Sequence, residues 1–158
     1  MLDEWLKDPG GLARALDVDE KELSKLSPEE LIEYFKKKLV ALIAEFPGKP
    51  FVVDSRNYND YYDGAIRKMN DTEAAVLCGM KNEPDDLVLY SEVVDAANQL
   101  YGKYGKPLFI TRGSRGSVVV DANGVTDIYG LMILSKVDTV GAGDSYLAGA
   151  ASTLAAGY

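Results

Sequence analysis

Short apolar segments of strand length alternate with longer helical segments along this sequence, and this alternation constrains the fold more than any other feature. "FVVD" at 51–54 and "PLFI" at 107–110 are continuous apolar runs, and "AIRKM" lies between them at 65–69. A continuous apolar run suits a strand of a parallel sheet that is covered on both faces. Helical segments precede, separate and follow these strands, so the sequence predicts an α/β fold in which helices pack on a sheet.

The helical segments carry recognisable boundary signals. Ser27, Pro28 and Glu30 form a capping-box start for a helix that runs to Pro47. A second helix is predicted over 71–79, a third over 91–105 and a last one from about residue 141. Between the third and the last, "GSVVVDANGVTDIYG" at 116–130 predicts a hairpin with Asn-Gly at its turn, at residues 123 and 124.

The length of 158 residues corresponds to about one domain. The sequence "LARALDVDEKELSKL" has helical spacing of leucines interrupted by polar residues. We therefore expect a helical segment of open placement over residues 1–26 and an α/β core over residues 27–158.

Composition excludes several classes of function. The net charge is −8 and no basic face stands out, which argues against nucleic-acid binding. One cysteine and no histidine exclude an intrachain disulfide, a cysteine-rich zinc site and every histidine-dependent nucleophile or metal site. A carboxylate is therefore the first candidate for a general base. No apolar run reaches membrane-spanning length and the charged N-terminus is unlike a signal peptide, so we expect a cytoplasmic protein without a membrane partner.

Three loops are expected at the carboxyl ends of the strands, where open α/β sheets bind ligands. In the first, at 70–73, Asn70 and Glu73 fit both a helix cap and a binding role. In the second, at 111–116, the glycines fit both a tight turn and an anion-binding nest. In the third, at 138–144, small residues place free amides at a helix N-terminus. Asp144 follows them and fits either a partner of the helix dipole or a reactive carboxylate.

Taken in order, these segments resemble the ribokinase/PfkB carbohydrate-kinase family. "DTVGAGDSYLAGA" at 138–150 resembles the family signature without a mismatch, and "KMNDTEAAVLCG" resembles its N-x-x-E segment, with Met69 where proline is frequent. "FITRGSRGSVVV" resembles the strand and turn that contact the nucleotide, and "DSR" at 54–56 resembles a subset of sugar kinases. The resemblance covers residues 31–158 and implies a three-layer α/β/α ribokinase-like sheet.

The resemblance also implies an activity, which is ATP-dependent phosphorylation of a sugar hydroxyl. Asp144 resembles the general base of the family, and the amides of the Gly-Ala-Gly-Asp turn resemble its anion hole, at Gly141, Ala142, Gly143 and Asp144. The residues that would border the nucleotide are Thr111, Gly113, Ser114 and Gly116. The implied partners are ATP and a small sugar, and the resemblance allows for a homodimer.

Two kinds of metal ion are implied by the same resemblance. Asn70 and Glu73 would act through water on Mg²⁺ and the phosphates. Asp138 resembles a ligand of the monovalent cation, such as K⁺, that some members of the family bind.

Parts of the family pattern are not recognisable in this sequence. They are the N-terminal glycine-rich sugar-binding motif, the strands of a lid, and the helical sequence that follows the last helix. We therefore expect a fragment of a longer kinase. The alternative is a truncated, non-catalytic α/β module that binds a nucleotide or a partner chain.

Overall fold

The computed structural model describes residues 20–23, 25–56, 58–81, 86–131, 133–134 and 138–157. The chain divides into two compact units, residues 1–45 and residues 46–158. Each unit is described by itself.

The described part of the first unit consists of α3 (Glu20–Leu23) and α4 (Pro28–Glu45). The predicted capping box is confirmed, because the amide of Ser27 donates to Glu30 Oε2 at 2.8 Å and the amide of Glu30 donates to Ser27 Oγ at 3.3 Å. Leu23 and Leu31 are buried together. Most of the helical segment predicted over residues 1–26 lies outside the described residues, so that domain division stays a prediction.

The second unit is built on one five-stranded sheet in the order β1-β2-β3-β4-β5. The strands are β1 (Val52–Asp54), β2 (Ile66–Asn70), β3 (Leu108–Thr111), β4 (Gly116–Asp121) and β5 (Gly124–Tyr129). The first three strands are parallel, and β4 and β5 are antiparallel to their neighbours. All the predicted strands are thus confirmed, although β1 lies at an edge and is only partly buried.

The hairpin differs slightly from its prediction. Asp121 pairs with Gly124, so the two connecting residues are Ala122 and Asn123, and Gly124 is the first residue of β5. The amide of Asn123 donates to Asp121 Oδ1 at 2.7 Å, which closes the turn through a side chain.

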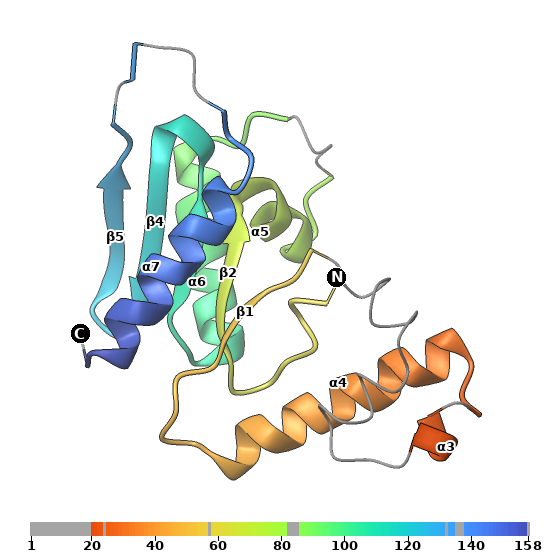
Figure 1. The fold of residues 1–158 in the computed structure, drawn as a ribbon. Coiled ribbons are helices and arrows are strands. Elements are labelled where there is room, and N and C mark those ends of the chain that lie inside the picture. Colours follow the sequence, from red (N-terminus) through yellow and green to blue (C-terminus); the bar gives the residue numbers. More distant parts are fainter. Residues whose placement is uncertain are drawn as a thin grey trace. The chain divides into compact units, whose positions relative to one another are not determined.

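Helices cover both faces of this sheet, giving the predicted three layers (Figure 1). On one face, α5 (Asp71–Leu77) and α6 (Tyr90–Tyr104) enclose the main core with side chains of β2, β3 and β4. The buried residues of this core include Met69, Leu100, Leu108, Ile110 and Val118. Because residues alternate between the faces of a strand, the neighbours of these core residues point to the opposite face.

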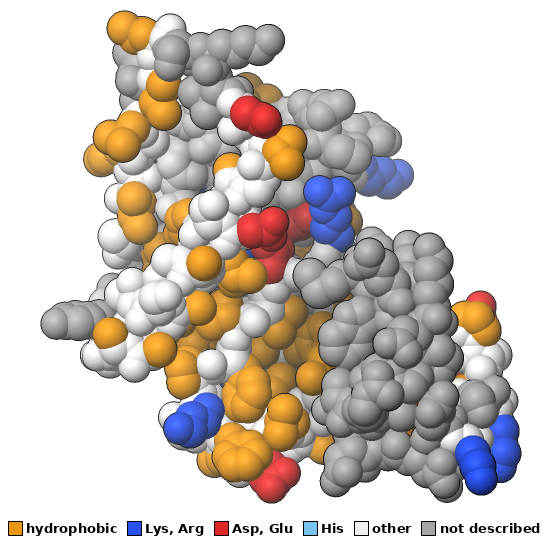
Figure 2. All heavy atoms as spheres, viewed as in Figure 1, with side chains coloured by type: hydrophobic (Ala, Val, Ile, Leu, Met, Phe, Trp, Pro, Cys, Tyr) orange, Lys and Arg blue, Asp and Glu red, His pale blue; other side chains and the backbone are white. Residues whose placement is uncertain are grey.

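The opposite face carries α7 (Ala142–Ala155), which packs less closely. The hydroxyl group of Tyr146 lies 3.0 Å from Ser117 Oγ. The Tyr146 and Phe109 rings meet edge to face, with their centres 6.2 Å apart. No residue of α7 is buried. A cavity of about 640 Å³ with mainly apolar walls separates much of the helix from the sheet. Figure 2 shows hydrophobic side chains gathered beside this helix.

An arginine in the middle of β2 organises the connection between β1 and β2. Arg67 is completely buried and donates three hydrogen bonds to the carbonyls of Asn59, Tyr62 and Ala65, at 2.8, 2.8 and 2.9 Å. Its guanidinium carbon lies 3.6 Å from the centre of the Tyr104 ring. Arg67 therefore fixes the connecting loop against α6.

Candidate active site

The carboxyl ends of β1 and β2 and the start of α7 enclose a polar cavity of about 550 Å³. Five residues of the predicted site line it, from two loops that are far apart in sequence: Asn70, Glu73, Gly141, Gly143 and Asp144. The other lining residues are Asp54, Arg56, Lys68, Thr139 and Val140. Figure 2 shows acidic and basic side chains next to one another close to the start of α7.

On the α5 side of the cavity, Asn70 and Glu73 cap the helix reciprocally. The amide of Glu73 donates to Asn70 Oδ1 at 2.7 Å, and the amide of Asn70 donates to Glu73 Oε2 at 2.9 Å. This capping box orients both side chains. The remaining polar atoms, Asn70 Nδ2 and Glu73 Oε1, have no hydrogen-bond partner among the residues that the structure describes, so they are available to a ligand.

On the α7 side, the turn before the helix presents backbone amides. Gly141 is the N-cap with φ of +78°, a conformation that favours glycine. The Ala142 amide donates to the carbonyl of Thr139 at 3.1 Å. Ala142 is therefore engaged in the turn, whereas the amides of Gly141, Gly143 and Asp144 have no hydrogen-bond partner within the described part of the chain.

Asp138 shapes the same turn but does not line the cavity. Its Oδ1 accepts a hydrogen bond from the Val140 amide at 3.0 Å. The Asp144 carboxylate, by contrast, lies at the cavity and has no hydrogen bond or ion pair with any residue in the described ranges. Asp144 is thus the uncommitted carboxylate of this loop.

A cation that the sequence analysis did not select lies between the two sides of the cavity. Lys68 Nζ forms an ion pair with Asp54 Oδ2 at 2.7 Å, and the lysine is largely buried. A Cβ atom on Gly143 would lie 3.0 Å from that ammonium nitrogen. Glycine at this position therefore lets the ammonium group approach the turn that precedes Asp144. Strand periodicity could have indicated Lys68, because it is two residues before Asn70 in β2 and shares its face.

The predicted nucleotide residues lie outside this cavity, at the end of β3, in η1 (Gly113–Arg115) and at the first residue of β4. Thr111 pairs with Asn70 across β3 and β2, which places the two loops side by side. Gly116 has φ of +93°, and a Cβ there would collide with the Ile128 carbonyl of β5. The backbone conformation and the close approach of β5 therefore explain the glycine at position 116, whatever else the loop does.

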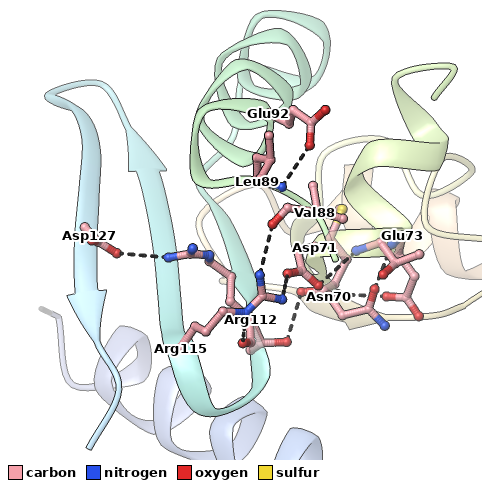
Figure 3. A network of polar contacts seen from close by, with 12 residues as sticks. Asn70, Asp71, Glu73, Val88, Leu89, Glu92, Arg112, Arg115 and Asp127 are labelled. Carbon is pink, nitrogen blue, oxygen red and sulfur yellow. Dashed lines mark hydrogen bonds and ion pairs between the residues drawn. The ribbon is translucent and has the colours of Figure 1, made fainter. Parts of the chain in front are cut away.

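A polar network joins this loop to the start of α5 (Figure 3). Arg115 donates to Asp71 Oδ2 at 2.7 Å, to the carbonyl of Val88 at 2.9 Å and to that of Arg112 at 3.2 Å. Arg112 is itself buried and lies 3.7 Å from Asp127. None of these contacts was predicted.

Mg²⁺ fits the cavity only in a water- and phosphate-assisted form. In the described ranges, no group of three or more histidine, cysteine, aspartate or glutamate residues could hold a metal ion. Mg²⁺ usually keeps several waters and binds one or two carboxylates together with substrate phosphates. One or two of the carboxylates that line the cavity, of Asp54, Glu73 and Asp144, can serve in this way. Within the same ranges, no helix has the length and apolar character needed to cross a membrane.

Comparison with known proteins identifies a family and a fold. A family model described as pfkB family carbohydrate kinase matches residues 22–158. No curated protein matches the chain significantly.

Several solved structures share the fold. The tetrameric inhibited form of phosphofructokinase-2 from Escherichia coli has a TM-score of 0.59 and 24% identity, over 76% of this chain and 40% of that one. Ribokinase from Arabidopsis thaliana, complexed with ribose and ATP, has a TM-score of 0.54 and 23% identity, over 81% of this chain and 39% of that one. The predicted ribokinase-like α/β fold is thus confirmed, and the chain spans about two fifths of the length of these structures.

Proposed function

The chain belongs to the pfkB family of carbohydrate kinases, and from this membership we propose that its polar cavity serves phosphoryl transfer from ATP to a sugar hydroxyl. The observation that carries the proposal is the convergence of three elements on one cavity. They are the uncommitted carboxylate of Asp144, the free amides at the start of α7 and the buried ammonium group of Lys68.

Asp144 acts as the general base. Its carboxylate accepts the proton of the sugar hydroxyl while that oxygen forms a bond to the γ-phosphorus of ATP. The bond from the γ-phosphorus to the bridging oxygen breaks, and ADP leaves with the electron pair. A carboxylate suits this role in a chain without histidine, and general-base catalysis contributes about 10² to 10⁴ in rate.

The amides of Gly143 and Asp144 and the ammonium group of Lys68 stabilise the charge on the transferring group. Phosphoryl transfer depends mainly on positioning and on positive potential around the equatorial oxygens. The amides lie at the N-terminus of α7, where the helix dipole also favours negative charge. Lys68 is held in place by Asp54, so its charge does not have to be reorganised during the reaction.

The remaining predicted residues have supporting roles in this proposal. Asn70 and Glu73 organise Mg²⁺ through water, and the ion would neutralise charge on the phosphates. Thr111, Gly113, Ser114 and Gly116 border the nucleotide. Asp138 contributes to a monovalent-cation site through the turn that it shapes.

The test is an ATP-consumption assay over a panel of sugars and sugar phosphates. We expect sugar-dependent turnover that falls by a factor of about 10² to 10⁴ in Asp144→Asn. Asp95→Asn, on the exposed side of α6, is the matched control because it removes a surface carboxylate outside the cavity. Turnover in Asp144→Asn equal to that of the unaltered protein refutes the assignment of the base. ATP binding without turnover on any sugar supports the non-catalytic module instead.

A further inference from the structure

The side chain of Arg115 links two loops that the sheet alone does not hold together. The ladder between β2 and β3 ends at the pair Asn70–Thr111. Beyond that pair, β2 continues into α5 at Asp71, and β3 continues into η1. Arg115 bridges the two and uses all three of its nitrogen atoms, for the contacts with Asp71, Val88 and Arg112 (Figure 3).

Asp71 depends on this contact. The residue is 7% exposed. One of its oxygens accepts from the Thr72 amide at 3.0 Å and the other accepts from Arg115 at 2.7 Å. A buried carboxylate that loses its cation is left largely uncompensated, which is costly. The first turn of α5 would therefore have to shift or admit water if Arg115 were removed.

That first turn carries two residues of the cavity. Asn70 caps α5 immediately before Asp71, and Glu73 closes the capping box from the same turn. A shift of Asp71 therefore moves both side chains relative to Lys68 and the start of α7. The supporting partners of metal-organising groups commonly change metal affinity by about 10- to 100-fold when they are removed.

We infer that Arg115 is a positioning residue, which acts through Asp71 to hold Asn70 and Glu73 in the cavity. This inference rests on the proposed function. It couples the loop after β3 to the Mg²⁺-organising side of the cavity, so a nucleotide that contacts η1 and an Mg²⁺ ion near Glu73 bind cooperatively.

Amide hydrogen exchange tests the positioning without any ligand. The amides of Asn70 and Glu73 are both bonded within the capping box, so their exchange reports its opening. We expect exchange at least about tenfold faster in Arg115→Gln and in Asp71→Asn, a change that corresponds to about 1.4 kcal/mol of lost local stability in the first turn of α5. Lys103→Gln is the control, because it removes an exposed ion pair, between Lys103 of α6 and Asp60, that involves neither loop. Unchanged exchange in both variants overturns the inference, whatever the protein does with ATP.

Calorimetric titration of a non-hydrolysable ATP analogue, with and without Mg²⁺, tests the coupling. We expect Mg²⁺ to tighten binding to the unaltered protein, and both variants to lose about tenfold or more of that enhancement. The double variant should lose no more than either single variant, because both remove the same contact. Arg115→Lys keeps the charge but not the forked geometry of the guanidinium group. Its Mg²⁺ enhancement of binding should therefore lie between that of the unaltered protein and that of Arg115→Gln.

The two proposals fail in different ways. The variants could show faster amide exchange while Mg²⁺ still tightens binding of the ATP analogue as much as in the unaltered protein. Arg115 would then have only a structural role, which overturns the inference and leaves the proposed function standing. Absence of Mg²⁺-dependent binding to the unaltered protein overturns the proposed function, and the coupling with it. Asp71→Asn is nearly isosteric, so it preserves the measurement if Arg115→Gln does not fold.

Discussion

Replacing Arg67 by methionine should strongly destabilise the second unit, because the connection between β1 and β2 depends on this side chain. Arg67→Met removes hydrogen bonds to three carbonyls, those of Asn59, Tyr62 and Ala65, and all three residues are buried. A buried polar group left unsatisfied costs about 1–3 kcal/mol. Loss of the stacking on Tyr104 adds about 1 kcal/mol. The gross cost is therefore at least about 4 kcal/mol.

Part of this cost is offset. Burial lowers the pKa of Arg67, which means that keeping this cation in the interior is itself unfavourable. Methionine has a similar length and carries no charge to desolvate. Taking about 1 kcal/mol as the offset, because an apolar replacement recovers some desolvation, we expect a net loss of about 3 kcal/mol. That is a large share of the 5–15 kcal/mol typical of a domain.

Urea denaturation followed by circular dichroism measures this loss from the midpoint and slope. Tyr104→Phe is the matched control, because it keeps the ring against Arg67 and removes only the hydrogen bond to the exposed carboxylate of Asp60. We expect it to cost less than about 1 kcal/mol. A loss below about 1 kcal/mol in Arg67→Met would show that the loop does not depend on these hydrogen bonds.

Three further predictions concern the cavity and the core behind it. Gly149→Ala should stabilise α7 by about 0.5–1 kcal/mol, because it lies inside the helix and its Cβ would meet no atom within 4 Å. Gly143→Ala should give no such gain, because its Cβ would lie 3.0 Å from Lys68 Nζ, and only this variant should lower kcat in the ATP-consumption assay. Glu73→Gln should keep the capping box, which accepts glutamine as well, and still raise the Mg²⁺ concentration needed for activity; an unchanged Mg²⁺ dependence contradicts its assigned role. Burial raises the pKa of the Cys78 thiol above its ordinary value of 9.0, so its stabilising contribution is full below pH 9 and declines as pH rises through the higher folded value. Between pH 8 and pH 10, the free energy of unfolding should therefore decline less in Cys78→Ala than in the unaltered protein, as measured by urea denaturation at both pH values.

The elements of this fold could be predicted because each has a local signal. The capping box at Ser27, the Asn70 cap and the glycine before α7 are patterns of a few neighbouring residues. Asn70 and Glu73 were selected as candidates for the same reason, and both line the cavity. Arg67 could not be recognised as a core residue, because its partners include a carbonyl eight residues away whose position depends on the folded loop. The bond between Arg115 and Asp71 spans 44 residues and has no local signal either.

The two walls of the cavity are held with unequal strength. The wall formed by β2 and α5 is fixed by the capping box, by the buried Arg67 and by the bond between Arg115 and Asp71. The α7 wall has no buried residue, and its hydrogen bond and ring contact with the sheet are those of Tyr146, beside an apolar cavity. Elements that move during function are drawn from the weakly packed parts of a fold. Lys68 belongs to the fixed wall, whereas Asp144 belongs to the loosely held one. A phosphate would therefore be received by a cation already in place, and the adjustment that brings the base to the hydroxyl would fall to α7.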